Sequence, residues 1–261
     1  MPLLRRLVIT SAVVGGPAYY VHSTVTRLEA KYPRLQPEAA STSAFRATPD
    51  PVNTYQHHGK HHTPHVDIYG AKVPAKTLLG QYDHPGGRKL SPDEAWARVF
   101  LNSPVLDLEG NLLGGLSTGA GDVGEDGFHK GQQLLNGAFE ILRPPSPPPS
   151  IFHPLAHPEP LLVRWVFSPG LVASCRKAAA DWGYPFRFMS GGRHEFSVGN
   201  VDHQGMVEVR FGSAHDYEWV DGEGKNQKTI PEWVARLHRA YAMWLLDERV
   251  QTLKMTADLF P

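Results

Sequence analysis

The sequence is poor in cysteine and has no excess charge of either sign. Its 261 residues include a single cysteine, Cys175, which excludes an intramolecular disulfide framework and an all-cysteine zinc site. The 26 Lys and Arg residues are balanced by 26 Asp and Glu residues, so nothing draws the chain as a whole toward nucleic acid. We therefore expect no nucleic-acid partner, and the composition leaves the oligomeric state open.

Signatures of nucleophilic and phosphate chemistry are also missing. The glycine-rich stretch 110–131 contains several acidic residues and no Lys-Ser or Lys-Thr pair, which makes it a poor phosphate cradle. Cys175 lies in an apolar segment, where a lone cysteine is more often buried and inert than reactive. We expect no bound cofactor.

The sequence has no long, uninterrupted apolar run. Residues 7–21 are almost wholly apolar or small, but this run of about 15 residues is shorter than the roughly 20 that span a bilayer. Residues 1–28 carry arginines and no acidic residue, which is typical of a targeting or anchoring segment. A signal peptide, a weak signal anchor and a mitochondrial presequence all fit, so we expect association with an endomembrane or mitochondrial membrane. The alternative is a helix packed loosely on the domain.

A linker is predicted for residues 29–63, which are rich in Pro, Ser, Thr, Ala and His and show no hydrophobic period. We expect residues 32–56 to be poorly ordered and removable. Imidazoles near a carboxylate can bind zinc, copper or nickel, but no rigid element holds them here, so we favour adventitious affinity and assign no metal site. The metal-capable residues are His57, His58, His61, His62, His65 and Asp67.

Residues 64–261 are predicted to form one α+β domain. Alternation of apolar and polar residues predicts strands, and Ser-Pro and Thr-x-Pro-Glu signals predict helix starts. The sheet is expected to be antiparallel and closed by a long C-terminal helix, with Pro- and Gly-rich insertions. The expected elements are a short edge strand and turn in 64–79, a helix from Ser91-Pro92, a strand at 161–167, a helix from Pro169 (or an extended segment) and a three-strand meander at 184–188, 194–198 and 207–211.

The C-terminal helix is expected to begin near Pro231, after the capping box Thr229 to Glu232, and to run for nearly 28 residues. A helix of this length must pack on a large surface, and the meander is the obvious one. A solvent-exposed Trp244 would overturn the expectation that the sheet wraps around this helix. The residues expected to be buried are Trp233, Leu237, Tyr241, Trp244 and Leu245.

A resemblance follows from residues 183–211, GYPFRFMSGGRHEFSVGNVDHQGMVEVRF, together with the terminal helix. This segment resembles the Gly-Tyr-x-Tyr…Gly-His…Glu-x-Phe-x-Val…Gly-x-Val pattern of an uncharacterised plant and bacterial branch of the START-like, helix-grip superfamily. Phe188-Met189-Ser190 stands where that branch has a Thr-Leu-Pro turn. The resemblance implies a curved sheet that wraps a helix around a cavity for an apolar ligand. In its basic N-terminal segment and Pro-rich insertions, the chain also resembles fungal proteins without an assigned domain, some of which are found with biosynthetic enzymes.

A polar constellation on the predicted strands is the candidate site. Two neighbouring strands bring Glu195, Glu208 and Arg210 to one face, and a histidine beside a carboxylate in a partly dry pocket becomes a usable acid or base. A solvated Glu–Arg ladder is the alternative. The candidate catalytic residues are His194, Glu195, Arg210 and His215, and the candidate ligand-binding residues are Tyr184, Arg187, Glu208, Asp216 and Tyr217.

Two functions are consistent with these patterns. The first is a START-like protein that handles a hydrophobic small molecule, lipid-like or polyketide-like, by cofactor-independent acid/base chemistry. The second is a non-catalytic, membrane-associated binding module. Polar groups that converge inside the cavity would favour the enzyme, and a purely apolar lining would favour carriage.

Overall fold

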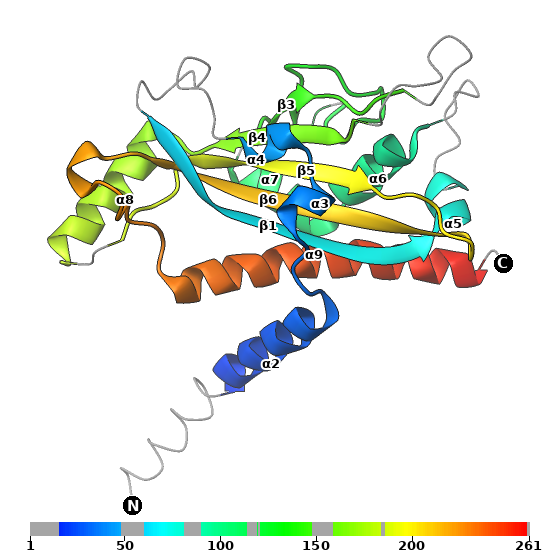
Figure 1. Cartoon of the computed structure of the whole chain (residues 1–261), viewed down its shortest axis with the longest axis horizontal. Coiled ribbons are helices and arrows are strands. Elements are labelled where there is room, and N and C mark those ends of the chain that lie inside the picture. The colour runs from blue at the N-terminus through cyan, green and yellow to red at the C-terminus, as the bar shows by residue number, and fades with distance from the viewer. Residues whose placement is uncertain are drawn as a thin grey trace, which may run out of the picture.

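The computed structural model describes residues 16–47, 60–80, 90–113, 119, 121–147, 159–183 and 186–259 (Figure 1). The helices are α2 (Gly16–Lys31), α3 (Pro37–Ala40), α4 (Ser43–Arg46), α5 (Ala75–Gly80), α6 (Pro92–Leu101), α7 (Pro104–Leu113), α8 (Pro169–Asp181), the short 3₁₀ helix η2 (Asp221–Glu223) and α9 (Glu232–Leu259). The strands are β1 (His61–Pro74), β2 (Gln133–Leu134), β3 (Phe139–Arg143), β4 (Leu161–Val166), β5 (Gly191–Val198) and β6 (Met206–Glu218).

The strands form one six-stranded sheet in the order β1-β6-β5-β4-β3-β2, and every neighbouring pair is antiparallel. This confirms the predicted α+β class, with an antiparallel sheet against a long C-terminal helix. The two longest strands, β1 and β6, pair along almost their whole length and form the edge that α9 follows (Figure 1).

The two faces of the sheet are covered by different parts of the chain. Successive side chains of a strand point to opposite faces, so β6 sends Phe211 to one face and Gly212 to the other. The Phe211 ring stacks on Phe100 of α6 at 4.5 Å, and α9 lies on this same face. On the opposite face the ring of Phe45 in α4 lies against Gly212, where an added Cβ would come within 2.8 Å of it. Glycine at position 212 therefore makes room for α4.

Helix α9 packs on the sheet through a different stripe from the one predicted. Trp233, Leu237 and Trp244 are 63%, 42% and 44% exposed, so their predicted burial is wrong. Leu245 is buried as predicted, and Tyr241 is half-buried at a cavity. The buried stripe uses small and aliphatic residues, which allow a close approach to β1, and it includes Ala235, Ala242, Met243, Leu246, Val250 and Leu253. The exposed Trp244 is the outcome that was expected to overturn a sheet wrapped around this helix, and the predicted packing is wrong at this residue. The six-stranded antiparallel sheet packed on α9 through another stripe is consistent with a helix-grip fold.

The first described residues pack on the body, which differs from the linker expected for 29–63. Helix α2 lies against α9, where Tyr32 donates to the carboxylate of Asp247 at 2.6 Å and Arg236 pairs with Glu29 at 2.7 Å. Phe45 is fully buried. In the described part of the chain, no helix combines the length and the hydropathy needed to cross a membrane.

Several local predictions are confirmed. Ser91 caps α6 by accepting the amide of Glu94, and Ser168 caps α8 by accepting the amide of Leu171. Strand β4 and the hairpin of β5 and β6 also lie where expected, and α9 has the predicted 28 residues.

Other local predictions are wrong. Residues 186–190 form no strand, and Tyr184 lies outside the described residues, so the meander consists of β4, β5 and β6. The edge strand β1 has 14 residues because it pairs along almost its whole length with β6, which has 13. Helix α5 replaces the turn that was expected after β1.

Candidate functional site

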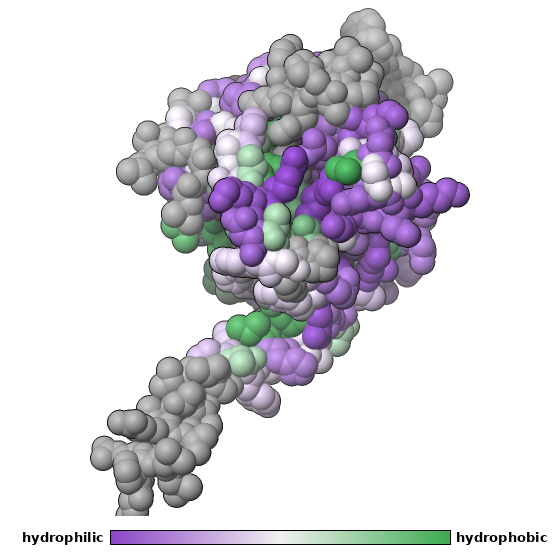
Figure 2. Space-filling model, turned by 90° about the vertical axis from the view of Figure 1, so that its left-hand side faces the viewer, coloured by the Kyte–Doolittle hydropathy of each residue, from purple (hydrophilic) through white to green (hydrophobic). Residues whose placement is uncertain are grey.

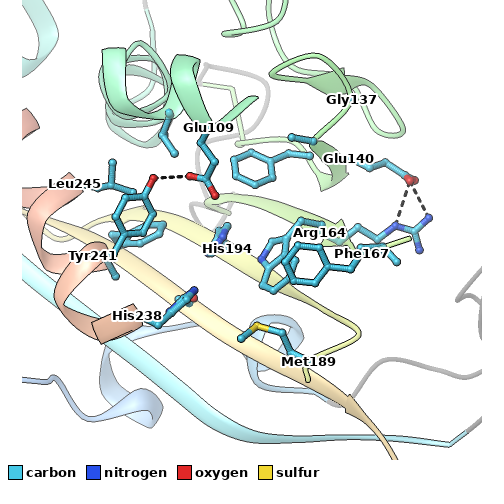
Figure 3. Close-up of a pocket in the computed structure, with 18 of the residues that line it drawn as sticks. Glu109, Gly137, Glu140, Arg164, Phe167, Met189, His194, His238, Tyr241 and Leu245 are labelled. Carbon is cyan, nitrogen blue, oxygen red and sulfur yellow. Dashed lines mark hydrogen bonds and ion pairs between the residues drawn. The ribbon is translucent and has the colours of Figure 1, made fainter. Parts of the chain in front are cut away.

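A cavity of about 820 Å³ lies between the sheet, α7, α8 and α9. Its wall is mainly aromatic and aliphatic, with a few polar side chains that project inward (Figure 3). The apolar wall includes Phe100, Leu106, Phe139, Trp165, Phe167, Phe188, Met189, Phe196, Phe211 and Leu245, and the polar residues are Glu109, Gln133, Glu140, Arg164, Ser168, His194, Ser213, His238 and Tyr241.

The sheet supplies His194 and Ser213, which are opposite each other in β5 and β6. Aromatic rings surround the imidazole of His194: the Trp165 indole is stacked on it at 6.0 Å and Phe211 lies at 5.1 Å. This apolar environment penalises the charged form, and burial lowers the pKa of His194 to about 3. His194 is therefore neutral at physiological pH.

Gly192 allows Trp165 to lie flat over the sheet. A Cβ on Gly192 would come within 2.5 Å of the indole ring and 2.3 Å of the Ala214 carbonyl oxygen. Any larger residue would displace the indole, so this glycine shapes the cavity wall.

Helix α9 supplies His238 and Tyr241, which face the sheet across the cavity (Figure 3). Burial lowers the pKa of His238 to about 4. The His238 ring meets the ring of His215 edge-on at 4.2 Å, and Nε2 of His215 lies 3.3 Å from the Ser213 hydroxyl. Burial also lowers the pKa of His215 well below its ordinary value. A neutral imidazole carries one donor and one acceptor, so the three rings form an uncharged polar group.

A carboxyl group is held at one end of the cavity. The Tyr241 hydroxyl donates to Oε2 of Glu109 in α7 at 2.5 Å (Figure 3). Burial raises the pKa of Glu109, and the hydrogen bond from Tyr241 partly offsets this rise. Burial also raises the pKa of Tyr241. A carboxyl with a raised pKa beside a phenol is a combination that suits proton transfer.

An ion pair lies at the other end. Arg164 donates to Oε2 of Glu140 through two nitrogens, at 3.1 and 2.7 Å (Figure 3). Since both residues are partly exposed, the pair marks the more open side of the cavity.

The structure divides the sequence-predicted residues between the two faces of the sheet. His194 lines the cavity, His215 lies directly behind His238, and Tyr217 is buried further along β6. The residues of the opposite face are Glu195, Glu208, Arg210 and Asp216. Arg187 lies apart from both groups, where it donates to the Glu218 carbonyl and pairs with Glu223 at 2.9 Å.

Contacts on the opposite face occupy the polar residues there. Glu195 accepts hydrogen bonds from the amide and hydroxyl of Thr42 and pairs with Arg143 at 3.3 Å. Arg210 pairs with Glu208 of its own strand at 2.5 Å, so the two glutamates of this face have different arginine partners. These groups lie on the face that α3 and α4 cover, away from the cavity.

Among the polar residues of the cavity wall, sequence reasoning assigned a site role only to His194, and it assigned none to Glu109, Ser213, His238 or Tyr241. His238, Tyr241 and Leu245 recur at spacings of three and four, which is the signal that one side of α9 faces a common space. Glu109 precedes a glycine-rich stretch and gave no local signal.

No metal centre emerges from the described residues, which contain no group of three or more potential ligands. His57 and His58 lie outside them. His62 and His65 lie in β1, and both rings contact Tyr217, at 5.7 and 6.1 Å.

Comparisons with models of protein families, with curated proteins and with solved structures gave no match to this chain.

Proposed function

We propose that this protein binds a hydrophobic small molecule in the cavity between the sheet and α9. The observation that supports this is the cavity itself: its volume of about 820 Å³ falls in the range of about 300–1,000 Å³ of known small-molecule sites, and its wall is mostly apolar with few polar groups. Its position is the one that a helix-grip fold uses for an apolar ligand. The aromatic wall favours flat, ring-containing or polyketide-like molecules over simple chains.

A cavity-filling variant tests this function. Ala242 is buried in α9 and lines the cavity, so Ala242→Phe places a ring in the ligand space without adding a polar group. We expect the wild-type protein to bind an apolar fluorescent probe such as 9-methylanthracene, and the variant to lose at least tenfold in affinity. Ala180→Phe, at an exposed position of α8, is the matched control and should bind normally. Equal binding by all three proteins would contradict the proposal.

We infer acid/base catalysis as a second candidate, because polar groups converge inside the cavity. Glu109 as a carboxylate takes a proton from a ligand carbon beside a carbonyl group and returns it to another ligand atom, so this isomerisation needs no co-reactant. Tyr241 holds the carboxyl in place, and His238 is available to hydrogen-bond the ligand oxygen. Non-catalytic carriage is the alternative.

Solvent exchange separates catalysis from carriage. The ligand that copurifies with the protein is incubated with it in D₂O, and mass spectrometry follows deuterium uptake. Catalysis predicts uptake that Glu109→Gln abolishes and Glu140→Gln, at the ion pair, leaves intact. Uptake at the rate of free ligand would support carriage.

We also propose that the N-terminal segment associates with a membrane. Tyr19, Tyr20 and Val21 are 73%, 71% and 46% exposed on α2. They end the mostly apolar or small run 7–21, and Figure 2 shows hydrophobic residues on α2 beside the body. Tyrosines are enriched where a chain meets the membrane surface. Flotation of the full chain with phosphatidylcholine vesicles, and no flotation after deletion of residues 1–15, is the expected result.

A further inference from the structure

Two imidazoles in the cavity have hydrogen-bonding capacity that the surrounding residues do not use. Nδ1 of His194 is buried and makes no hydrogen bond of regular geometry among the described residues, although the Gly212 backbone is a polar neighbour of the ring. His238 projects from α9 toward the sheet (Figure 3), and its ring contacts are with the edge of His215. Buried polar atoms are nearly always satisfied, by protein, water or ligand. The two rings therefore indicate a polar group on the molecule that fills the cavity.

A third unused group lies on the same side. The indole N–H of Trp165 is buried and unpaired within the described residues, and the ring is stacked on His194. An indole nitrogen only donates, whereas a neutral imidazole both donates and accepts. Together these groups match a hydroxyl or carbonyl oxygen, which accepts up to two hydrogen bonds and, as a hydroxyl, also donates one.

The charges around the cavity exclude an anionic ligand group. The lining residues that carry charge are already paired: Arg164 with Glu140, and Glu109 with Tyr241. Burial keeps His194 and His238 neutral, so neither ring offers a positive charge. A carboxylate or phosphate would enter this space without a counter-ion, which is costly.

We propose, on the basis of the ligand-binding function above, that the cavity selects a neutral ligand with an oxygen group, which His194 and His238 hold from opposite walls. The ligand class is an uncharged, ring-containing alcohol, phenol or ketone. Its oxygen lies midway along the cavity, between the Tyr241–Glu109 pair and the Arg164–Glu140 pair. The aromatic walls on either side take up its carbon skeleton.

Three probes with one ring system test this selectivity: 9-anthracenemethanol, 9-methylanthracene and 9-anthracenecarboxylate. Fluorescence titration should show that the alcohol binds about three- to tenfold more tightly than the methyl compound, which is the effect of one or two hydrogen bonds. The carboxylate should bind about tenfold or more weakly than the alcohol, because its charge is unpaired.

Histidine variants assign the preference to the two rings. His194→Phe and His238→Phe keep ring size and remove the polar atoms, so each should reduce the preference for the alcohol while binding of 9-methylanthracene changes by less than about twofold. His238→Gln restores one donor and one acceptor and should recover the preference in part. His203→Phe, at an exposed loop position, is the matched control and should behave as the wild type.

The outcomes separate this proposal from the function on which it rests. Binding of 9-methylanthracene that Ala242→Phe abolishes, without any preference for the alcohol, overturns the selectivity alone. A preference for the alcohol that persists in both His194→Phe and His238→Phe also overturns the selectivity alone. So does binding of the carboxylate that is tighter than binding of the alcohol. Failure of every probe to bind, with no effect of Ala242→Phe, overturns ligand binding and the selectivity together.

Discussion

Tyr241 and Glu109 join two helices across one end of the cavity: the phenol of α9 donates to the carboxyl of α7 at 2.5 Å. Both side chains are half-buried, and both have raised pKa values because of burial. This contact fixes the distance between α7 and α9 where no strand lies between them. It therefore shapes the cavity as well as its chemistry.

Removing this hydroxyl should destabilise the fold. Tyr241→Phe leaves a buried carboxyl group without its donor, which costs about 1–3 kcal/mol in the free energy of unfolding. Urea denaturation at pH 7 measures this, and a cycle with Glu109→Gln should give a coupling energy of about 0.5–3 kcal/mol. Tyr19→Phe, at an exposed tyrosine of α2, is the control and should change nothing. A coupling energy near zero would mean that the two side chains act independently.

The fold class was predictable because helix caps and turns are specified by residues close together in the sequence. Ser91 and Ser168, each followed by a proline, indicated the starts of α6 and α8, where their side chains cap the helices. The turn at 202–205 separates β5 from β6. The burial of α9 was not predictable in the same way. The aromatic residues of α9 led to the prediction of a buried aromatic stripe. Small residues such as Ala235 are buried instead, and Trp244 is exposed.

The acidic group of Asp93 should make the stability depend on pH. Asp93 is buried in the first turn of α6 and accepts the amide of Val198 at 2.8 Å. Burial is the largest cause that raises its pKa from 3.8 to about 6. A raised carboxyl pKa means that the folded state holds the proton more tightly, so this contribution is present below pH 3.8 and is lost as the pH rises through about 6.

The corresponding variant is Asp93→Asn, which keeps an acceptor for Val198 and removes the titration. We expect the stability of the wild type relative to this variant to fall by about 2 kcal/mol between pH 4 and pH 7. Denaturation curves at several pH values measure the difference. Asp126→Asn, at an exposed loop position, should show no such trend. A difference independent of pH would show that the pKa of Asp93 is the same in the folded and unfolded states.

Phe45 should be an essential core residue although it lies in a segment with linker-like composition. Its ring is fully buried against Ile68, Leu162 and Ala214. Phe45→Ala should therefore cost about 3–5 kcal/mol, as large core truncations do. Tyr20→Ala, on the exposed side of α2, should stay within about 0.5 kcal/mol. If Phe45→Ala left the melting temperature unchanged, residues 29–47 would be a dispensable linker after all.

The site was only partly predictable, because its residues come from segments far apart in the sequence. The alternation of β5 and β6 grouped Glu195, Glu208 and Arg210 correctly on one face. It gave no information on which face would border the cavity. That depends on the placement of α4 and α9, and the contact of α4 depends on Gly212, whose role appears only once Phe45 is in place.

Two ion pairs on the face covered by α4, Arg210 with Glu208 and Arg193 with Asp216, should contribute very unequally to stability. Arg210 pairs with Glu208 at a partly exposed position, so Arg210→Ala should cost no more than about 1 kcal/mol. Arg193 and Asp216 form a buried pair at 2.9 Å, and Thr63 hydrogen-bonds to both. Asp216→Ala leaves a buried guanidinium without its counter-ion and should cost about 3–5 kcal/mol.

The double variant Arg193→Met with Asp216→Leu distinguishes a structural pair from a ligand-binding one. Removing both charges avoids the uncompensated guanidinium, so we expect the double variant to be more stable than Asp216→Ala alone. Because the pair lies on the face covered by α4, binding of 9-methylanthracene in the cavity should be unchanged. Urea denaturation and fluorescence titration measure the two properties on the same protein. A stable double variant that no longer binds the probe would return Asp216 to the ligand site, whereas normal binding assigns the pair to the fold alone.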